Sequence, residues 1–159
     1  MQKSKSRLVP VIAFTGFFAG MLDITAALLH YYIVTQKNPL RVFQYISSSI
    51  YGPSAYSGNF NMILAGVIIH FFIAYFFTTI FFLVYPHLKL NRLSPFLVAI
   101  IYGILIWLTM NMLVLPLTKV ALPKNFEARQ VMIGILILIC AIGLPVSLAA
   151  KKFYSKKSI

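Results

Sequence analysis

Four long apolar runs, separated by short polar segments, dominate the pattern of hydrophobic and polar positions along this chain. The runs cover residues 9–34, 60–85, 95–117 and 131–150. Each is long enough to cross the roughly 30 Å hydrocarbon core of a bilayer as a helix, which takes about 20 residues. The pattern predicts an all-α, polytopic membrane protein with four transmembrane helices in a single domain over residues 1–159.

The segment between the first two runs predicts one further helix. Asn38-Pro39 is typical of a helix start and Gly52-Pro53 of a helix end. Between them the apolar side chains and the polar side chains fall on separate helical faces: Val42, Phe43, Ile46 and Ile50 on one, Arg41, Gln44, Ser47 and Ser48 on the other. We expect an amphipathic interfacial helix at about residues 39–51 on the outer membrane surface. It either packs on the bundle as a fixed lid or moves as a re-entrant or gating element.

The composition supports a membrane protein. Of the 159 residues, 60% are hydrophobic and 10% are charged, whereas soluble domains carry roughly a quarter charged residues. The net charge of +12 comes from Lys and Arg side chains that avoid the apolar runs. Basic residues beside membrane spans set orientation and contact anionic lipids. We therefore expect the lipid bilayer as a partner, with anionic lipids at the basic termini, and no nucleic acid.

The distribution of basic residues predicts the orientation. The larger group lies at the two termini and between the second and third spans: Lys3, Lys5, Arg7, Lys89, Arg92, Lys151, Lys152, Lys156 and Lys157. The smaller group lies in the other two connections: Lys37, Arg41, Lys119, Lys124 and Arg129. Both termini should therefore be cytoplasmic. The first run is also preceded by basic residues, as in a signal peptide, but it is longer than a signal h-region and predicts a retained helix.

Several short motifs carry a resemblance. Asp23 in the first span is followed by Asn38-Pro39, by Phe43-Gln44-Tyr45-Ile46-Ser47-Ser48, by His70-Phe71 and by Leu115-Pro116-Leu117. In these motifs the chain resembles a group of small uncharacterised bacterial inner-membrane proteins, the YagU-like proteins. The resemblance implies a multi-pass protein of the bacterial inner (cytoplasmic) membrane. It implies no activity, because the group has no agreed biochemical function.

Asp23 is one of two acidic residues in the chain, and it lies near the middle of the first span. Helix rise places it roughly 16 Å below the outer end of that span, and it places His70 at roughly 15 Å in the second span. Gly16, Gly20, Asp23, Ala27 and His30 follow one another at helical spacing and form one stripe. This stripe of small and ionisable residues should face protein, because an unpaired carboxylate in lipid is costly.

The second span offers a matching surface. Gly66, His70, Ala74 and Thr78 share one helical face. Facing the first helix, these small residues allow close approach to Gly16 and Gly20. We predict an intramembrane polar site at Asp23 and His70, in which Asn111 and His30, at roughly 9 and 6 Å depth, line an outward route. Gly16, Gly20 and Gly66 are the predicted helix-packing residues.

Three classes of function stay open. The first is proton- or ion-linked transport through Asp23 and His70. The second is a non-catalytic membrane scaffold or accessory subunit in which the pair locks the packing. The third is an intramembrane enzyme or a haem protein, the least favoured because no nucleophile or known catalytic motif accompanies the pair. No catalytic residue, metal site or cofactor is predicted. His30 and His70 lie at different depths, which does not suit a haem held by two histidines. A zinc site would have only Cys140 to add to Asp23 and His70. A transporter with four helices would need to form a homo-oligomer or join a larger membrane complex.

Overall fold

The computed structural model describes residues 2–120 and 127–155 of the chain, and it is all-α over these residues. Four continuous helical stretches are long and apolar enough to cross a membrane: Arg7–Thr35, Phe60–Val84, Pro95–Leu117 and Ala128–Ser155. The predicted fold class is confirmed. Lys124, Lys156 and Lys157, which the orientation argument used, lie outside the described residues, as do the side chains of Lys3 and Lys5.

The helices follow one another in a simple order. The first span is α1 (Gln2–Thr35), followed by the short α2 (Arg41–Tyr51), a 3-10 turn at Gly52–Tyr56 and the second span, α3 (Phe60–Val84). The third span consists of α4 (Pro95–Leu108), a π-helical segment at Thr109–Val114 and a 3-10 turn at Leu115–Leu117. The fourth consists of α5 (Ala128–Leu138), a π-helical segment at Ile139–Gly143 and α6 (Leu144–Ser155).

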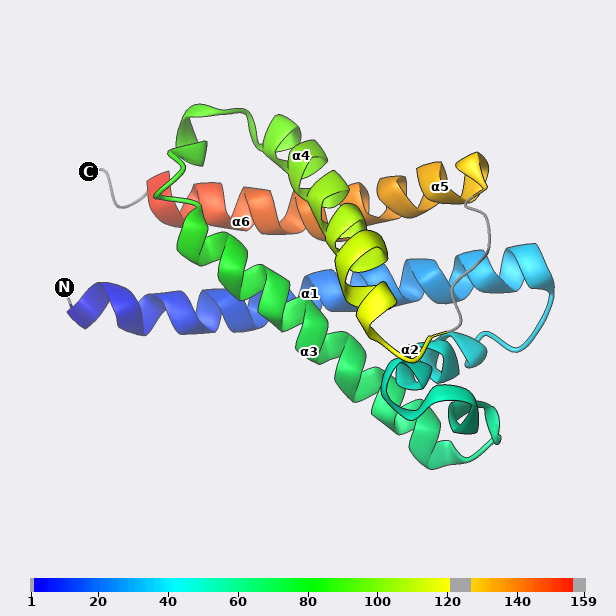
Figure 1. Cartoon of the computed structure of the whole chain (residues 1–159). Coiled ribbons are helices and arrows are strands. Elements are labelled where there is room, and N and C mark those ends of the chain that lie inside the picture. Colours follow the sequence, from blue (N-terminus) through cyan, green and yellow to red (C-terminus); the bar gives the residue numbers. More distant parts are fainter. Residues whose placement is uncertain (1, 121–126, 156–159) are drawn as a thin grey trace.

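Both termini lie at one end of the bundle and α2 lies at the other, as Figure 1 shows. We call these the terminal end and the α2 end. In the middle of the bundle, α1 packs on α3 and on the fourth span, and α4 packs on the fourth span. At the α2 end, α2 packs on α3 and contacts α1, so a short helix that does not cross the bundle lies against these two spans.

The buried core fills the terminal end. Its largest fully buried side chains are Tyr85 and Phe82, and aromatic rings join them in a continuous cluster with Phe81 and Tyr102. Tyrosine hydroxyls tie the helices together here: Tyr102 donates to the carbonyl oxygen of Phe77 at 2.8 Å, and Tyr154 donates to that of Phe82 at 2.6 Å. The aromatic rings and the two hydroxyl bonds therefore join α3, α4 and α6 in the terminal half of the bundle.

The distribution of buried and exposed side chains is typical of a helical bundle in a membrane. Large apolar side chains such as Phe14, Phe72 and Leu105 are more than half exposed, whereas Thr78, Ser47 and Ser147 are fully buried. Apolar side chains gain nothing by leaving lipid for protein, so small residues at helix interfaces and bulky residues outside are the expected arrangement. This distribution supports lipid as the surroundings of all four long helices.

Both π-helical segments lie near a proline that cannot donate a backbone hydrogen bond. Pro116 follows the segment Thr109–Val114, and Pro145 follows the segment Ile139–Gly143. A missing N–H in a helix frees a carbonyl on the preceding turn, and a wider turn is one way to accommodate it. Gly143 lies so close to α4 that a β-carbon there would come within 2.5 Å of the carbonyl oxygen of Ala99. The irregular turn thus allows backbone contact between the third and fourth spans.

The α2 helix begins two residues later than predicted, at Arg41, and its faces differ from the prediction. Ser47 and Ser48, expected on the polar face, are 0% and 2% exposed, whereas Ile50, expected on the apolar face, is 52% exposed. The serine hydroxyls donate to the carbonyl oxygens of Gln44 and Tyr45 within the helix. Small satisfied serines permit close packing on α3, and in a membrane the isoleucine gains nothing by facing inward. Phe43 of the predicted apolar face is buried as well, so the buried side of α2 combines an apolar residue with two serines.

Candidate functional site

His70 joins α3 to α1 near the middle of the bundle. Its Nε2 lies 2.9 Å from the carbonyl oxygen of Gly20. A carbonyl can only accept, so Nε2 carries the proton and donates it. The His70 side chain is 8% exposed, and Nδ1 takes no part in this hydrogen bond.

Glycine on α1 makes this contact sterically feasible. A β-carbon at Gly20 would come within 3.2 Å of Ala74 and within 3.1 Å of the Phe71 ring. One turn earlier, a β-carbon at Gly16 would lie 2.6 Å from the Tyr75 ring. Gly16 and Gly20 on α1 therefore pack on α3. Gly66 instead lies against α2, where a β-carbon would overlap the carbonyl oxygen of Phe43.

Asp23 lies one turn from Gly20 on α1, within electrostatic range of His70. Its carboxyl group makes no hydrogen bond with any residue in the described ranges. Every side-chain nitrogen or oxygen that is fully buried in this part of the chain has a hydrogen-bond partner. Asp23 itself is partly buried. The structure brings the predicted acid and imidazole together, with no hydrogen bond to the acid from the described residues.

The open space beside Asp23 is a cavity of about 210 Å³ that is partly open to the surface. Asp23 and His70 contribute its ionisable groups, and Tyr45, Ser49 and Thr118 contribute hydroxyls. The rest of its lining is apolar: Ile46, Ile73, Ala74, Phe77, Ile106, Met110, Val114, Leu115, Val120, Leu138 and Ile142. The cavity therefore runs from the Asp23–His70 pair toward the α2 end, and Phe77 and Ile142 separate it from the aromatic core.

Two segments outside the regular spans line the cavity at the α2 end. Tyr45, Ile46 and Ser49 come from α2, and Leu115, Thr118 and Val120 come from the end of the third span. The Lys119 amide donates to the carbonyl oxygen of Ser49 at 3.1 Å and ties these two segments together. Sequence reasoning missed these residues. The signals near them in the sequence are the motif Phe43–Ser48, which belongs to the predicted interfacial helix and to the resemblance, and Leu115–Leu117, which belongs to the resemblance.

The other predicted site residues lie elsewhere. Asn111 donates from Nδ2 to the carbonyl oxygen of Trp107 one turn back, at 2.9 Å, and it does not line the cavity. His30 faces a different hollow, near Glu127 and Arg129. The structure therefore does not assemble the predicted outward route through Asn111 and His30.

The structure also separates the residues considered for metal or haem binding. Cys140 is exposed on the outside of the fourth span, and His30 and His70 border different spaces. Within residues 2–120 and 127–155 no three His, Cys, Asp or Glu side chains come close enough to hold a metal ion. The site is thus an acid–imidazole pair on the wall of a mostly apolar cavity.

No family model, no curated protein and no solved structure matches this chain. The resemblance to YagU-like proteins stays a prediction. What the protein does has to be argued from the cavity and its two ionisable groups.

Proposed function

We propose that this protein is a proton-linked membrane transporter in which Asp23 binds the proton and His70 is its charge partner. One observation carries the proposal: a carboxyl group without a hydrogen-bond partner lines a cavity in the middle of a membrane-type bundle. An ionised carboxylate at this depth costs at least about 2.5 kcal/mol on insertion scales. A packing residue would be expected to recover that cost through hydrogen bonds, whereas a proton carrier needs its carboxyl group accessible.

The hydrogen bond of His70 divides the roles within the pair. With Nε2 donating to Gly20, the imidazole keeps its orientation whether or not Nδ1 is protonated. A protonated His70 offsets the charge of an ionised Asp23, and a neutral His70 leaves Asp23 to be balanced by a proton or by a bound cation. Arrival of a solute in the cavity would therefore change the proton occupancy of the pair, which is the coupling that transport requires.

The cavity lies toward one end of the bundle. Residues of α2 and of the end of the third span line it, whereas the aromatic core fills the terminal end. The predicted orientation, with both termini cytoplasmic in a bacterial inner membrane, would make this the outward-facing form. Residues of both π-helical segments, among them Met110, Val114 and Ile142, line the cavity. Segments of this kind are frequent at functional sites, and we place the movement that opens the other side there.

A flux assay tests the proposal. The protein is reconstituted in liposomes with a pH-sensitive dye inside, and proton entry is driven by an imposed potential, alone and with panels of small cationic, neutral and anionic solutes outside. We expect protein-dependent proton movement that falls at least tenfold in Asp23→Asn and is partly kept in Asp23→Glu. His30→Gln is the matched control, because His30 is a histidine of the first span that does not line the cavity. Equal flux in Asp23→Asn and the unaltered protein, with both monodisperse, would refute the proposal.

One observation favours the scaffold alternative. The bond from His70 to Gly20 links α1 and α3, as a structural lock would. If locking were the whole role of the pair, Asp23→Asn would lower thermal stability as much as His70→Ala does. Because Asp23 makes no hydrogen bond within the described residues, we expect only the His70 variant to lose stability.

A further inference from the structure

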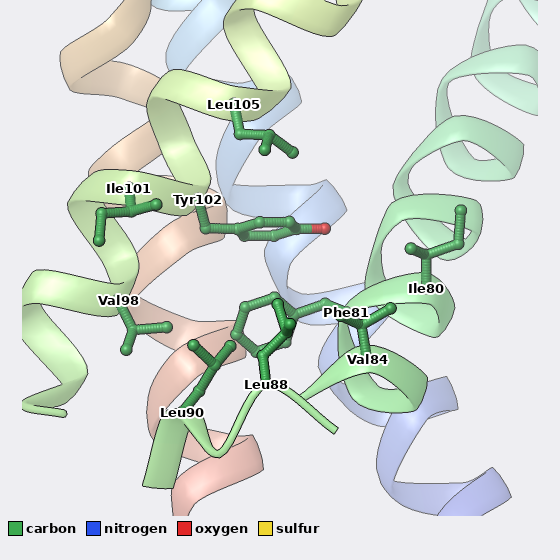
Figure 2. Close-up of a pocket in the computed structure, with 9 residues that line it drawn as sticks. All are labelled: Ile80, Phe81, Val84, Leu88, Leu90, Val98, Ile101, Tyr102 and Leu105. Carbon is green, nitrogen blue, oxygen red and sulfur yellow. The ribbon is translucent and has the colours of Figure 1, made fainter. Parts of the chain in front are cut away.

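A second cavity lies between α3 and α4, near the terminal end and apart from Asp23. It has a volume of about 170 Å³ and is lined by Ile80, Phe81, Val84, Leu88, Leu90, Val98, Ile101, Tyr102 and Leu105. Figure 2 shows α4 side chains along one wall, α3 side chains along the other, and Leu88 and Leu90 of the connecting loop at one end. The one polar atom in view is the Tyr102 hydroxyl oxygen, and its proton is donated to Phe77. We call this space the α3–α4 groove.

The groove is open to the side where lipid would lie. Ile101 and Leu105 on α4 are each 51% exposed, and Ile80 and Val84 on α3 are also exposed. Although α3 and α4 are consecutive, they are not among the helix pairs that pack closely along the described chain. The rings of Phe81 and Tyr102, with centroids 4.4 Å apart, bridge them at the floor of the groove. From Val98 to Leu105 the groove follows α4 for roughly 10 Å, which suits an extended hydrocarbon chain.

Basic side chains lie at the loop end of the groove. The loop between α3 and α4 directs Leu88 and Leu90 into the groove, while His87, Lys89 and Arg92 line an adjoining open hollow of about 580 Å³. Asn91 and Tyr154 border the same hollow. One loop of a few residues thus presents apolar side chains on one side and cationic side chains on the other.

The loop is held in place by its own hydrogen bonds and by α6. The Leu90 amide donates to the carbonyl oxygen of Tyr85 at 3.2 Å, and Lys151 Nζ donates to that of Leu93 at 3.3 Å. Tyr85 is stacked on Tyr154 of α6, with ring centroids 5.4 Å apart. The cationic hollow therefore exists before any ligand arrives.

No carboxylate side chain of the protein can neutralise Lys89 and Arg92. The chain has two acidic residues: Asp23 lies in the middle of the bundle, and Glu127 lies beside His30 at the α2 end. A pair of cations at the membrane surface attracts an anion, and an apolar groove beside it attracts a hydrocarbon chain. An anionic phospholipid carries both groups in one molecule.

We propose that the α3–α4 groove and the adjoining hollow bind one anionic phospholipid. An acyl chain lies in the groove against Ile101 and Leu105, and the phosphate lies in the hollow beside Lys89 and Arg92. This site is distinct from the lipid contacts expected at the basic termini, and it does not depend on transport through Asp23. The ordered loop, whose residues border both the groove and the hollow, distinguishes this site from general attraction between a basic protein and an anionic membrane.

Lipid titration of the purified protein, followed by native mass spectrometry, tests the site. Phosphatidylglycerol and phosphatidylcholine with the same acyl chains are compared. We expect one phosphatidylglycerol to be retained with at least tenfold higher affinity than phosphatidylcholine. The double variant Lys89→Gln, Arg92→Gln should lose about 25-fold in affinity for phosphatidylglycerol, because each charge near an anionic headgroup contributes about fivefold.

Two further variants separate the specific site from general effects. Lys37→Gln, Arg41→Gln removes the same charge at the α2 end and should leave the retained lipid unchanged. Ile101→Trp fills the groove and should weaken both lipids alike, with the preference for phosphatidylglycerol kept. Equal affinities for the two lipids, or equal losses in the two double variants, would overturn the proposal.

Discussion

Substitution of Gly66 by alanine is the sharpest test of how α2 is held over the cavity. A β-carbon at this position would overlap the carbonyl oxygen of Phe43 and would lie 2.7 Å from its carbonyl carbon and 2.9 Å from its Cα. All three are backbone atoms, so no rotamer change relieves the overlap. Either α2 moves away from α3 or both backbones distort.

The expected size of the effect follows from these contacts. Overpacking of a tight contact costs about 1 to 3 kcal/mol, and a value of about 2 kcal/mol raises the population of undocked α2 roughly 30-fold. Gly134→Ala is a matched control, since its new β-carbon would lie 3.2 Å from the Trp107 ring nitrogen, a side-chain atom. If both backbones distorted while α2 stayed docked, the effect would appear in the rest of the bundle and not in α2.

Amide hydrogen exchange measures the undocking directly. In Gly66→Ala we expect amides of Arg41–Tyr51 to exchange roughly 10- to 30-fold faster, while amides of Pro95–Leu108 keep their rates, because α4 is not part of the contact. Gly134→Ala should leave α2 unchanged. Unchanged exchange in α2 of the Gly66 variant would show that close backbone packing on α3 does not hold this helix.

Other contacts give smaller or differently placed effects. In Gly143→Ala the new β-carbon meets the carbonyl oxygen of Ala99, and we expect a stability loss of about 1 to 3 kcal/mol in chemical denaturation; no loss would show that the π-helical segment adapts. Tyr102→Phe removes the hydrogen bond to Phe77 and should cost about 1 kcal/mol in the same measurement, whereas an unchanged midpoint would mean that ring packing alone joins α3 and α4. Ser47→Val adds volume at a fully buried position of α2 and should loosen that helix in hydrogen exchange without lowering the stability of the spans; a stabilised α2 would contradict this packing.

Much of the fold could be predicted because a helix that crosses a bilayer has to be long and mostly apolar. The four spans followed from hydropathy and length. The residues before the second and third spans, Asn59 and Ser94, are of the types that favour helix starts. Asn59 accepts a hydrogen bond from the Asn61 amide, and Ser94 accepts one from the Leu97 amide ahead of the third span. The shared depth of Asp23 and His70 followed from helix rise, and the stripe of small residues indicated the face on which α1 meets α3.

The remaining features depend on packing that hydropathy does not encode. Lipid and protein interior are equally apolar, so a pattern of apolar residues cannot say which face of α2 turns inward. Polar residues in a span can also satisfy themselves: Asn111, Thr78 and Thr109 each donate to a carbonyl oxygen one turn back. Polarity within a span is therefore a poor guide to the site, and the α2 part of the cavity forms only when the loops fold back.

The open carboxyl group of Asp23 is the central claim, and infrared spectroscopy of that group tests it most directly. The chain has two acidic side chains, so the variant Glu127→Gln leaves Asp23 as the one acidic side chain. We predict a carboxylic acid C=O band that titrates with pH, shifts promptly on transfer to D₂O because water reaches the cavity, and vanishes when Asp23→Asn is added. A band that resists exchange and titration would contradict the account, because it would show a carboxyl group sealed in the bundle.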